Sequence, residues 1–182
     1  MADLISGNLD ADMKNSWRTD PEVFKALNRE FNFSIDVAAD PINSLCEHWY
    51  SALHDALTND WAEMLMQIEL HMSAFCNPPY GRGMIEKFMQ KAIEQKHKGV
   101  TTVMLVPATL DAQWLPVNDI SEIRIITGGR LSFYHPINNK KVNGNTKGSM
   151  FVIFRPSIMP CVVRLIDRNE LLGTKKRLKV AA

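Results

Sequence analysis

The sequence predicts an α/β fold with a mostly parallel sheet and helices on both of its faces. Residues Thr101–Val106 form an unbroken apolar run, which is typical of a parallel strand covered on both sides. An amphipathic helix over Met84–Lys98 precedes this run, and a buried strand over His71–Cys76 precedes the helix. Strand, turn, helix and strand in this order predict a crossover between parallel strands. A length of 182 residues, 46% of them hydrophobic, fits one such domain.

The first elements of the domain are a helix and a core strand. Apolar residues recur at helical spacing within Glu22–Phe31, and this predicts a helix. Thr19 or Asp20 can cap that helix, with Pro21 as its first residue. The segment Phe33–Pro41 then predicts the first core strand, which ends in small residues and a turn made by an acidic residue and a proline.

The remaining segments complete the sheet. Asn43–Tyr50 is expected to be helical or irregular, and Ala112–Val117 to form a short helix. His135–Gly148 is rich in Asn, Gly and Lys and predicts a long exposed loop, a kind of loop that is often functional. Further strands are predicted over Glu122–Thr127, Met150–Phe154 and Val162–Ile166, and an antiparallel direction is considered for Met150–Phe154.

These elements divide the chain into three parts. We expect a flexible arm at 1–15, one domain at 16–170 with a basic loop at 135–148, and a basic tail at 171–182. No apolar run approaches the roughly 20 residues of a membrane span, and the first residues do not form a secretory signal, so we expect a cytoplasmic protein. No metal site is expected, because the histidines are scattered and Cys46, Cys76 and Cys161 are widely spaced.

The segment Asn77-Pro78-Pro79-Tyr80 carries the most specific chemical signal in the chain. The two prolines stop the preceding strand, so this segment lies at the carboxyl end of a sheet strand, where α/β proteins bind ligands. The Asn77 side-chain oxygen and the Pro78 carbonyl can accept hydrogen bonds from an exocyclic amine, and Tyr80 offers a ring for stacking. A base held in this way must leave its duplex. The alternative interpretation is a rigid turn with a tyrosine packed over it.

Three other segments could line the same site. Asp36 lies in a strand that ends in alanines, so its carboxylate could bind a ribose hydroxyl or a cationic amino-acid group. Asp60 could accept a hydrogen bond from an adenine amine, with Trp61 as a wall; the alternative is a helix cap followed by a buried tryptophan. Trp17 could form another wall or pack against the helix that follows it.

Charge is distributed unevenly along the chain. Residues 1–80 contain 13 Asp and Glu against 4 Lys and Arg, whereas residues 81–182 contain 7 against 17. A polyanion that meets the later half would fit this distribution, and a solvated basic face is the alternative. No acidic residue occurs within 123–166, while the basic residues there are Arg124, Arg130, Lys140, Lys141, Lys147, Arg155 and Arg164.

Taken in order, these segments resemble the small phage-type Dam DNA adenine methyltransferases. The resemblance covers about residues 17–156. It implies methyl transfer from S-adenosylmethionine to the exocyclic N6 amine of adenine in double-stranded DNA, on a Rossmann-like methyltransferase fold. It also implies a phage or prophage gene expressed in a bacterial cell. The motifs are Trp17-x-Thr19, Ile35-Asp36-Val37-Ala38-Ala39, Asp60-Trp61, Cys76-Asn77-Pro78-Pro79-Tyr80, Leu105-Val106-Pro107-Ala108 with Trp114, Gly129-Arg130-Leu131-x-Phe133 and Ser149–Pro156.

The resemblance also implies roles for individual residues. Asn77, Pro78, Pro79 and Tyr80 would hold the target adenine. The cofactor site would be lined by Trp17, Thr19, Asp36, Asp60, Phe75 and Asn77. The DNA contacts, which would mainly grip phosphate, are expected from Arg130, Lys140, Lys141 and Lys147, with further contacts from 81–84 and the basic tail.

Three competing functions share some of these features. The same four-residue motif can serve a methyltransferase acting on the N4 amine of cytosine, or one acting on a glutamine side chain of a protein. The basic later half argues against a protein substrate. A catalytically silent DNA-binding accessory protein is the third possibility, and the intact Asn77, Pro78, Tyr80 and Asp36 argue against it.

Overall fold

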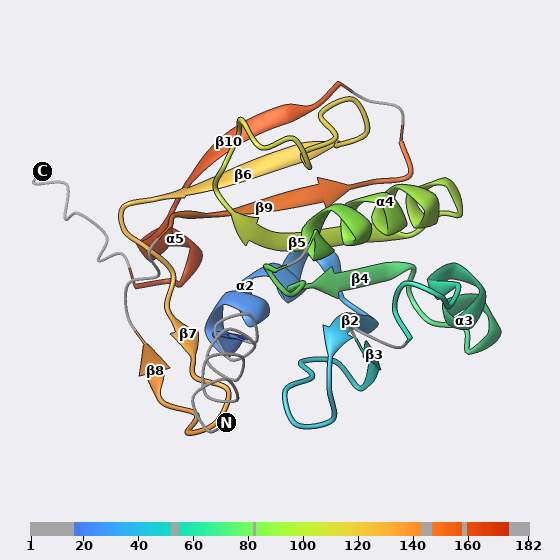
Figure 1. The fold of residues 1–182 in the computed structure, drawn as a ribbon, viewed down its shortest axis with the longest axis horizontal. Coiled ribbons are helices and arrows are strands. Elements are labelled where there is room, and N and C mark those ends of the chain that lie inside the picture. The colour runs from blue at the N-terminus through green and yellow to red at the C-terminus, as the bar shows by residue number, and fades with distance from the viewer. Residues whose placement is uncertain (1–16, 52–54, 82, 143–146, 158–159, 175–182) are drawn as a thin grey trace, which may run out of the picture.

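The computed structural model describes residues 17–51, 55–81, 83–142, 147–157 and 160–174. Their central feature is a seven-stranded sheet flanked by helices (Figure 1). In sheet order its strands are β10 (Val162–Asp167), β6 (Glu122–Thr127), β9 (Ser149–Phe154), β5 (Thr101–Pro107), β4 (Ser73–Cys76), β2 (Ile35–Ala39) and β3 (His48–Ser51). A second sheet joins β1 (Arg18–Thr19), β7 (Phe133–Tyr134) and β8 (Lys141–Val142).

The large sheet is mostly parallel, as the sequence predicted. Of the strands that the structure describes in this sheet, β9 alone runs against its neighbours, pairing antiparallel with both β5 and β6. The predicted crossover is also confirmed, because β4 and β5 are parallel neighbours joined through α4 (Met84–His97). All the parallel strands therefore end at one edge, here called the carboxyl edge, and begin at the opposite edge, here called the amino edge.

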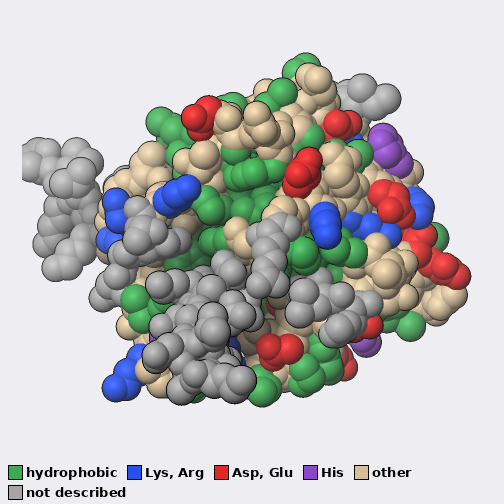
Figure 2. All heavy atoms as spheres, viewed as in Figure 1, with side chains coloured by type: hydrophobic (Ala, Val, Ile, Leu, Met, Phe, Trp, Pro, Cys, Tyr) green, Lys and Arg blue, Asp and Glu red, His purple; other side chains and the backbone are tan. Residues whose placement is uncertain are grey.

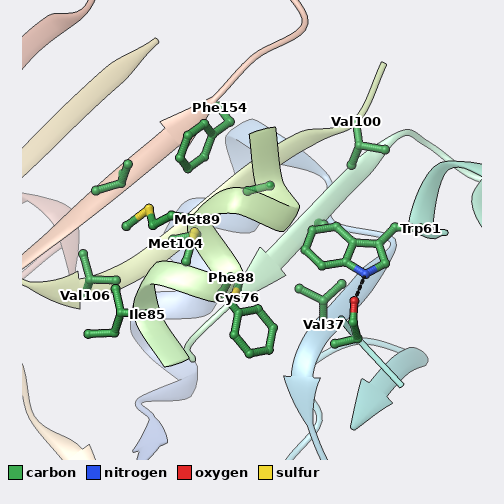
Figure 3. Packing of buried hydrophobic residues seen from close by; sticks show 14 of the residues in the cluster. Val37, Trp61, Cys76, Ile85, Phe88, Met89, Val100, Met104, Val106 and Phe154 are labelled. Atoms are coloured by element: carbon green, nitrogen blue, oxygen red, sulfur yellow. Dashed lines mark hydrogen bonds between the residues drawn. The ribbon is translucent and has the colours of Figure 1, made fainter. Parts of the chain in front are cut away.

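Helices cover both faces of this sheet, and alternation along the strands supplies an apolar surface to each face. On one face α3 (Trp61–Gln67) and α4 pack on Ala74, Cys76 and Met104. Figure 3 shows this layer, in which Trp61 from α3 and Phe88 from α4 meet the strands. On the other face α2 (Pro21–Phe31) packs on Phe75 and Val103.

Helix α2 begins and ends where its sequence provides caps. The side chain of Asp20 accepts a hydrogen bond from the Glu22 N–H at 3.1 Å, and Pro21 occupies the first turn, where a missing N–H costs nothing. At the other end Asn32 adopts the left-handed conformation, with φ of 46°. Of the two predicted caps, Asp20 is therefore the one the chain uses.

Three segments differ from their predictions. Asn43–Tyr50 was expected to be helical or irregular, but His48–Ser51 forms β3, a short edge strand that pairs with β2. The helix expected over Ala112–Val117 was wrong; turns occupy this segment, and Pro116 within it lacks the N–H that a helix interior needs. Within the predicted loop His135–Gly148, Lys141–Val142 forms β8 against β7.

The last described element is α5 (Arg168–Leu171), a single turn that follows β10. The predicted N-terminal arm at 1–15 lies outside the described residues, as does the part of the basic tail from residue 175 onward. Among the residues that are described, no helix is long and apolar enough to cross a membrane.

Candidate active site at the carboxyl edge

The order of the strands reverses between β2 and β4. From β2 the chain moves outward to β3, returns to place β4 on the other side of β2, and then continues outward to β5. Helices on opposite faces of the sheet leave a crevice at such a reversal, and ligands of open α/β sheets bind there, beyond the carboxyl ends of the strands. The ends of β2 and β4 carry the two most chemically specific motifs predicted from the sequence.

Asn77 directly follows β4, and its amide is held in a defined orientation. Its Nδ2 donates a hydrogen bond to the backbone carbonyl of Trp17 at 3.0 Å. Because the nitrogen is bound, the carbonyl oxygen on the other side of the amide remains an acceptor. Asn77 as a whole is partly exposed.

The residues after Asn77 form a fixed rim beside it. Pro78 is buried, and Pro79 and Tyr80 are partly exposed. The Tyr80 hydroxyl donates to the Leu105 carbonyl of the neighbouring strand β5 at 3.4 Å. Burial raises the pKa of Tyr80 well above its usual value, so the ring stays neutral. The four-residue motif thus presents an amide oxygen, peptide carbonyls and a neutral aromatic ring.

Asp36 lies on the neighbouring strand β2, with its side chain 4% exposed. Its two oxygens accept hydrogen bonds from the backbone N–H groups of Ala38 and Leu45, each at 3.3 Å. Burial raises the pKa of Asp36 to about 7, and these two bonds only partly oppose that shift. A buried carboxyl group with two long hydrogen bonds is suited to receive a cation or a hydroxyl donor.

Both ends of the basic loop at 135–148 lie at this edge. The His135 ring meets the Trp17 ring edge-on, with centroids 5.4 Å apart. At the other end, Gly148 accepts a hydrogen bond from the Ala108 N–H at 2.9 Å, directly after β5. The structure therefore brings the predicted DNA-binding loop beside the predicted base-binding motif, although the two are far apart in the sequence.

The four predicted DNA-binding residues differ in their surroundings. Arg130, Lys140 and Lys147 are exposed. Lys141 is also exposed, but its Nζ pairs with Asp20 at 2.6 Å, and this contact raises the pKa of the lysine. Figure 2 shows basic side chains at the end of the molecule where β7 and β8 lie.

Of the predicted cofactor residues, Phe75 and Thr19 are packed in the protein. Phe75 is 1% exposed, and its ring contacts those of Phe24 and Phe33 at centroid distances of 5.3 and 5.5 Å. Thr19 is 6% exposed and pairs with Phe133 through β1 and β7. Both side chains are therefore used mainly in packing.

The structure does not bring Asp60 to the carboxyl edge. Its side chain caps α3 through the Glu63 N–H at 3.2 Å and pairs with Lys98 at 2.7 Å. Lys98 follows α4 and precedes β5, so this ion pair lies at the amino edge. Burial opposes ionisation of Asp60, but Lys98 and the Glu63 N–H lower its pKa. Trp61 is fully buried, as expected for the helix-cap alternative.

Part of the basic later half is neutralised within the protein. Glu122 is 5% exposed and accepts from Arg124 at 2.8 Å, Arg155 at 2.9 Å and Arg164 at 3.1 Å. Glu30 pairs with Arg124 at 2.6 Å. Three of the seven basic residues between 123 and 166 therefore have carboxylate partners at the amino edge, and they do not contribute to the basic surface at the carboxyl edge.

Sequence reasoning missed the backbone role of Trp17. It considered the tryptophan ring as a wall, whereas the contact with Asn77 is made by the carbonyl oxygen of Trp17. No residue pattern reports such a contact, because every residue carries a carbonyl. Within the described ranges, no group of three or more His, Cys, Asp or Glu side chains could hold a metal ion.

The fold and the residues at its carboxyl edge together define a class: an α/β protein with a candidate ligand site at the strand-order reversal of a mostly parallel sheet. The chain belongs to the DNA N-6-adenine-methyltransferase (Dam) family, whose family model matches residues 6–178. The resemblance stated from the motifs is therefore confirmed.

Two curated relatives support this membership. The DNA N-6-adenine-methyltransferase of Escherichia phage T1 is 29% identical over 160 residues, which cover 79% of this chain and 63% of the phage protein. An Escherichia coli (strain K12) protein named "Putative methyltransferase YfdM" is 40% identical over 67 residues, 36% of this chain and 71% of that protein. The chain thus spans somewhat less than two thirds of the phage T1 relative.

Proposed function

We propose that this protein transfers a methyl group from S-adenosylmethionine to the exocyclic N6 amine of adenine in double-stranded DNA. The observation that carries the proposal is the orientation of Asn77 at the strand-order reversal, where its Nδ2 is bound by Trp17 and its oxygen remains an acceptor. Membership of the Dam family and the name of the phage T1 relative support the same reaction.

In this proposal the target adenine leaves its stack and enters the site beside Tyr80. The Asn77 side-chain oxygen and the Pro78 carbonyl accept hydrogen bonds from its amino group. These acceptors turn the nitrogen lone pair toward the methyl donor and stabilise the positive charge that develops on the amine. The excess proton of the methylated amine can leave to water, so the site needs no general base.

The residues at the end of β2 fit the proposed cofactor. When bound, S-adenosylmethionine supplies an electrophilic methyl group. It carries an ammonium group and ribose hydroxyls, and the buried Asp36 carboxyl could receive either of them. The small side chains of Ala38 and Ala39 would allow the cofactor to approach the backbone after that carboxyl. We include Trp17, Thr19, Asp36 and Asn77 in the proposed cofactor site, with Phe75 as its packed floor, and we omit Asp60 because Lys98 already pairs with it.

The proposal extends to the fold and to the DNA surface. The sheet order, with one antiparallel strand beside parallel ones, supports a Rossmann-like methyltransferase arrangement. Exposed Arg130, Lys140 and Lys147, together with Lys141, would bind phosphates around the site. Such contacts make binding depend steeply on salt, but they carry little information about base sequence.

The test is to incubate the protein with labelled S-adenosylmethionine and unmethylated DNA, digest the DNA to nucleosides, and identify the labelled nucleoside by mass spectrometry. We expect the labelled nucleoside to be N6-methyldeoxyadenosine. Labelled methylcytosine would overturn the choice of base, and absence of label together with absence of cofactor binding in calorimetry would overturn the enzyme assignment.

The variant that tests the role of Asn77 in the same assay is Asn77→Ala. We expect the rate of methyl transfer to fall about 100-fold or more, because the variant loses an acceptor that acts on the developing charge. Folding should change little, since the Asn77 side chain is partly exposed. Turnover equal to that of the unmodified protein would contradict the role given to Asn77.

A further inference from the structure

The small sheet β1-β7-β8 has two different faces. One face packs on the α2 side of the core through Phe133, which is 4% exposed, and Trp17, whose ring meets that of His135. Side chains alternate between the two faces along each strand, so Arg18, next to Trp17, and Tyr134, next to Phe133, point to the opposite face. Lys141 pairs with Tyr134 and points to that same face.

Arg18, Tyr134 and Lys141 form one row across the three strands. Arg18 pairs with Tyr134 in the β1–β7 ladder, and Tyr134 pairs with Lys141 in the β7–β8 ladder. Directly opposed residues of antiparallel strands have neighbouring side chains. The Lys141 Nζ accordingly lies 5.9 Å from the centroid of the Tyr134 ring. The row therefore consists of an aromatic ring with a cation on each side.

The cation at one end of this row lacks a counter-ion in the described part of the chain. The Nε of Arg18 is buried and has no hydrogen-bond partner. No described carboxylate pairs with Arg18, whereas Arg124 and Arg155 are each bound by Glu122. A buried donor without an acceptor is costly, and its presence points to a missing partner.

The cation at the other end is held in place and keeps donors for a ligand. Lys141 donates to Asp20 at 2.6 Å, and Asp20 is 3% exposed and caps α2. An ammonium group has three donors, and the Lys141 side chain remains 45% exposed. Asp20 therefore fixes the position of Lys141 without using all of its hydrogen-bonding capacity.

The row begins beside the candidate active site. The residue before Arg18 is Trp17, whose carbonyl accepts the hydrogen bond from Asn77. Strands in a sheet lie about 4.8 Å apart, so the backbones of Arg18 and Lys141 are separated by roughly 10 Å across the ring of Tyr134. Two cations at that separation can contact phosphates on either side of one nucleotide.

We propose that the Arg18–Tyr134–Lys141 row binds the DNA strand next to the extruded adenine, with the Tyr134 ring stacked on an unpaired base and the two cations on its flanking phosphates. Extrusion of a base leaves unpaired bases in its vicinity, and an aromatic ring in a basic groove is the usual platform for them. The inference rests on the proposed function for the identity of the neighbouring site, but it concerns DNA binding and not methyl transfer.

The test measures binding of a short single-stranded oligonucleotide by fluorescence anisotropy over a series of salt concentrations. Tyr134→Leu keeps the apolar bulk and removes the aromatic face, so affinity should fall roughly 5- to 150-fold, the worth of one stacked base. Tyr134→Phe should bind like the unmodified protein. Arg18→Gln and Lys141→Gln should each reduce the slope of log affinity against log salt by about 0.7 to 1.

The matched control is Arg29→Gln, which removes an exposed cation from the last turn of α2. It should leave the affinity within about twofold of the unmodified value, allowing for one remote surface charge. Lys141→Arg should restore the salt slope, which separates loss of charge from loss of the Asp20 contact. Thermal unfolding of each variant confirms that it is folded at the temperature of the binding assay.

The outcomes separate this inference from the proposed function. Unchanged binding by Tyr134→Leu and Arg18→Gln, in a protein that forms N6-methyladenosine, would overturn the inference and leave the proposed function standing. Weakened binding by these variants, in a protein that labels no adenine, would support the inference and overturn the proposed function.

Discussion

The two edges of the large sheet both carry charged and polar residues, but these residues are bound differently. At the amino edge Glu122 is bound by three arginines, and Asp60 is bound by Lys98. At the carboxyl edge the partners of Asn77 and Asp36 among the described residues are backbone groups, namely Trp17 in one case and Ala38 and Leu45 in the other. Groups whose charge is matched by protein counter-ions stabilise the fold, whereas groups bound only by backbone keep capacity for a ligand.

The pKa shifts of Glu122, at the amino edge, and Asp36, at the carboxyl edge, differ in the same way. Burial alone would raise the pKa of Glu122, yet the donors and charges of Arg124 and Arg155 lower it. No cation of the described segments pairs with Asp36, and burial raises its pKa to about 7. Neighbouring cations therefore keep Glu122 ionised, while Asp36 takes up a proton near neutral pH. This difference separates a structural carboxylate from a candidate ligand-binding one.

The largest effect on stability is expected from Glu122→Gln. Removal of its charge leaves three arginines without their shared partner, and breaking a buried ion pair of this kind costs about 3 kcal/mol. Urea unfolding should report this loss. Glu30→Gln is the matched control, because Glu30 pairs with Arg124 but is 48% exposed, and its loss should cost about 1 kcal/mol or less. Equal losses in the two variants would contradict the distinction between the buried and the exposed partner.

A pH-dependent effect is expected from Asp36. Its carboxyl group keeps its proton up to about pH 7 in the folded protein and releases it near pH 4 when unfolded. The folded state therefore binds more protons in this range, and the contribution of Asp36 to stability is lost as the pH rises from about 4 to about 7. Asp36→Asn cannot titrate, so its urea midpoint should rise relative to that of the unmodified protein between pH 5 and pH 8.

If the urea midpoints of the two proteins changed with pH in the same way over this range, Asp36 would already be ionised in the folded state.

A bound cation should lower the pKa of Asp36, because it favours the carboxylate. Affinity for S-adenosylmethionine should therefore increase between pH 6 and pH 8 in calorimetry, and the increase should be absent in Asp36→Asn.

The smallest effect is expected from Asp60→Asn. Asparagine retains the helix cap, so only the partly exposed ion pair with Lys98 is lost, at a cost of about 0.5 kcal/mol. The KM for S-adenosylmethionine should not change, because the Lys98 pair lies at the edge opposite Asn77. A large rise in KM would show that Asp60 reaches the cofactor and would break the contrast between the two edges.

Local sequence predicted a helix or strand correctly wherever the residues of that one segment show a clear pattern. The spacing of apolar residues predicted α2, α4 and most strands of the sheet, and two prolines after an apolar run placed Asn77 beyond the end of β4. The local sequence did not predict β3, whose four residues are partly or fully exposed and gain their strand conformation from pairing with β2. A short edge strand of this kind has no alternation of its own to detect.

At the candidate site, too, local sequence could not decide the role of residues whose partners are distant in the chain. Asp60 in its local sequence suits both a helix cap and a ligand-binding loop. In the structure it caps α3 through the Glu63 N–H, and its contact with Lys98, 38 residues later, places it at the amino edge. The basic run between residues 123 and 166 likewise predicts one positive surface, yet Arg124, Arg155 and Arg164 are matched by Glu122. Counter-ions distant in sequence decide which charges remain available.

The sequence by itself therefore determined the α/β class, the position of Asn77-Pro78-Pro79-Tyr80 at the end of a strand and the family resemblance, because these depend on residues within a few positions of one another. Only the tertiary structure decided that the Trp17 carbonyl orients Asn77, that Asp60 belongs to the amino edge, and that Arg18, Tyr134 and Lys141 form one row. Each of those facts depends on a contact between segments that meet only when the sheets assemble.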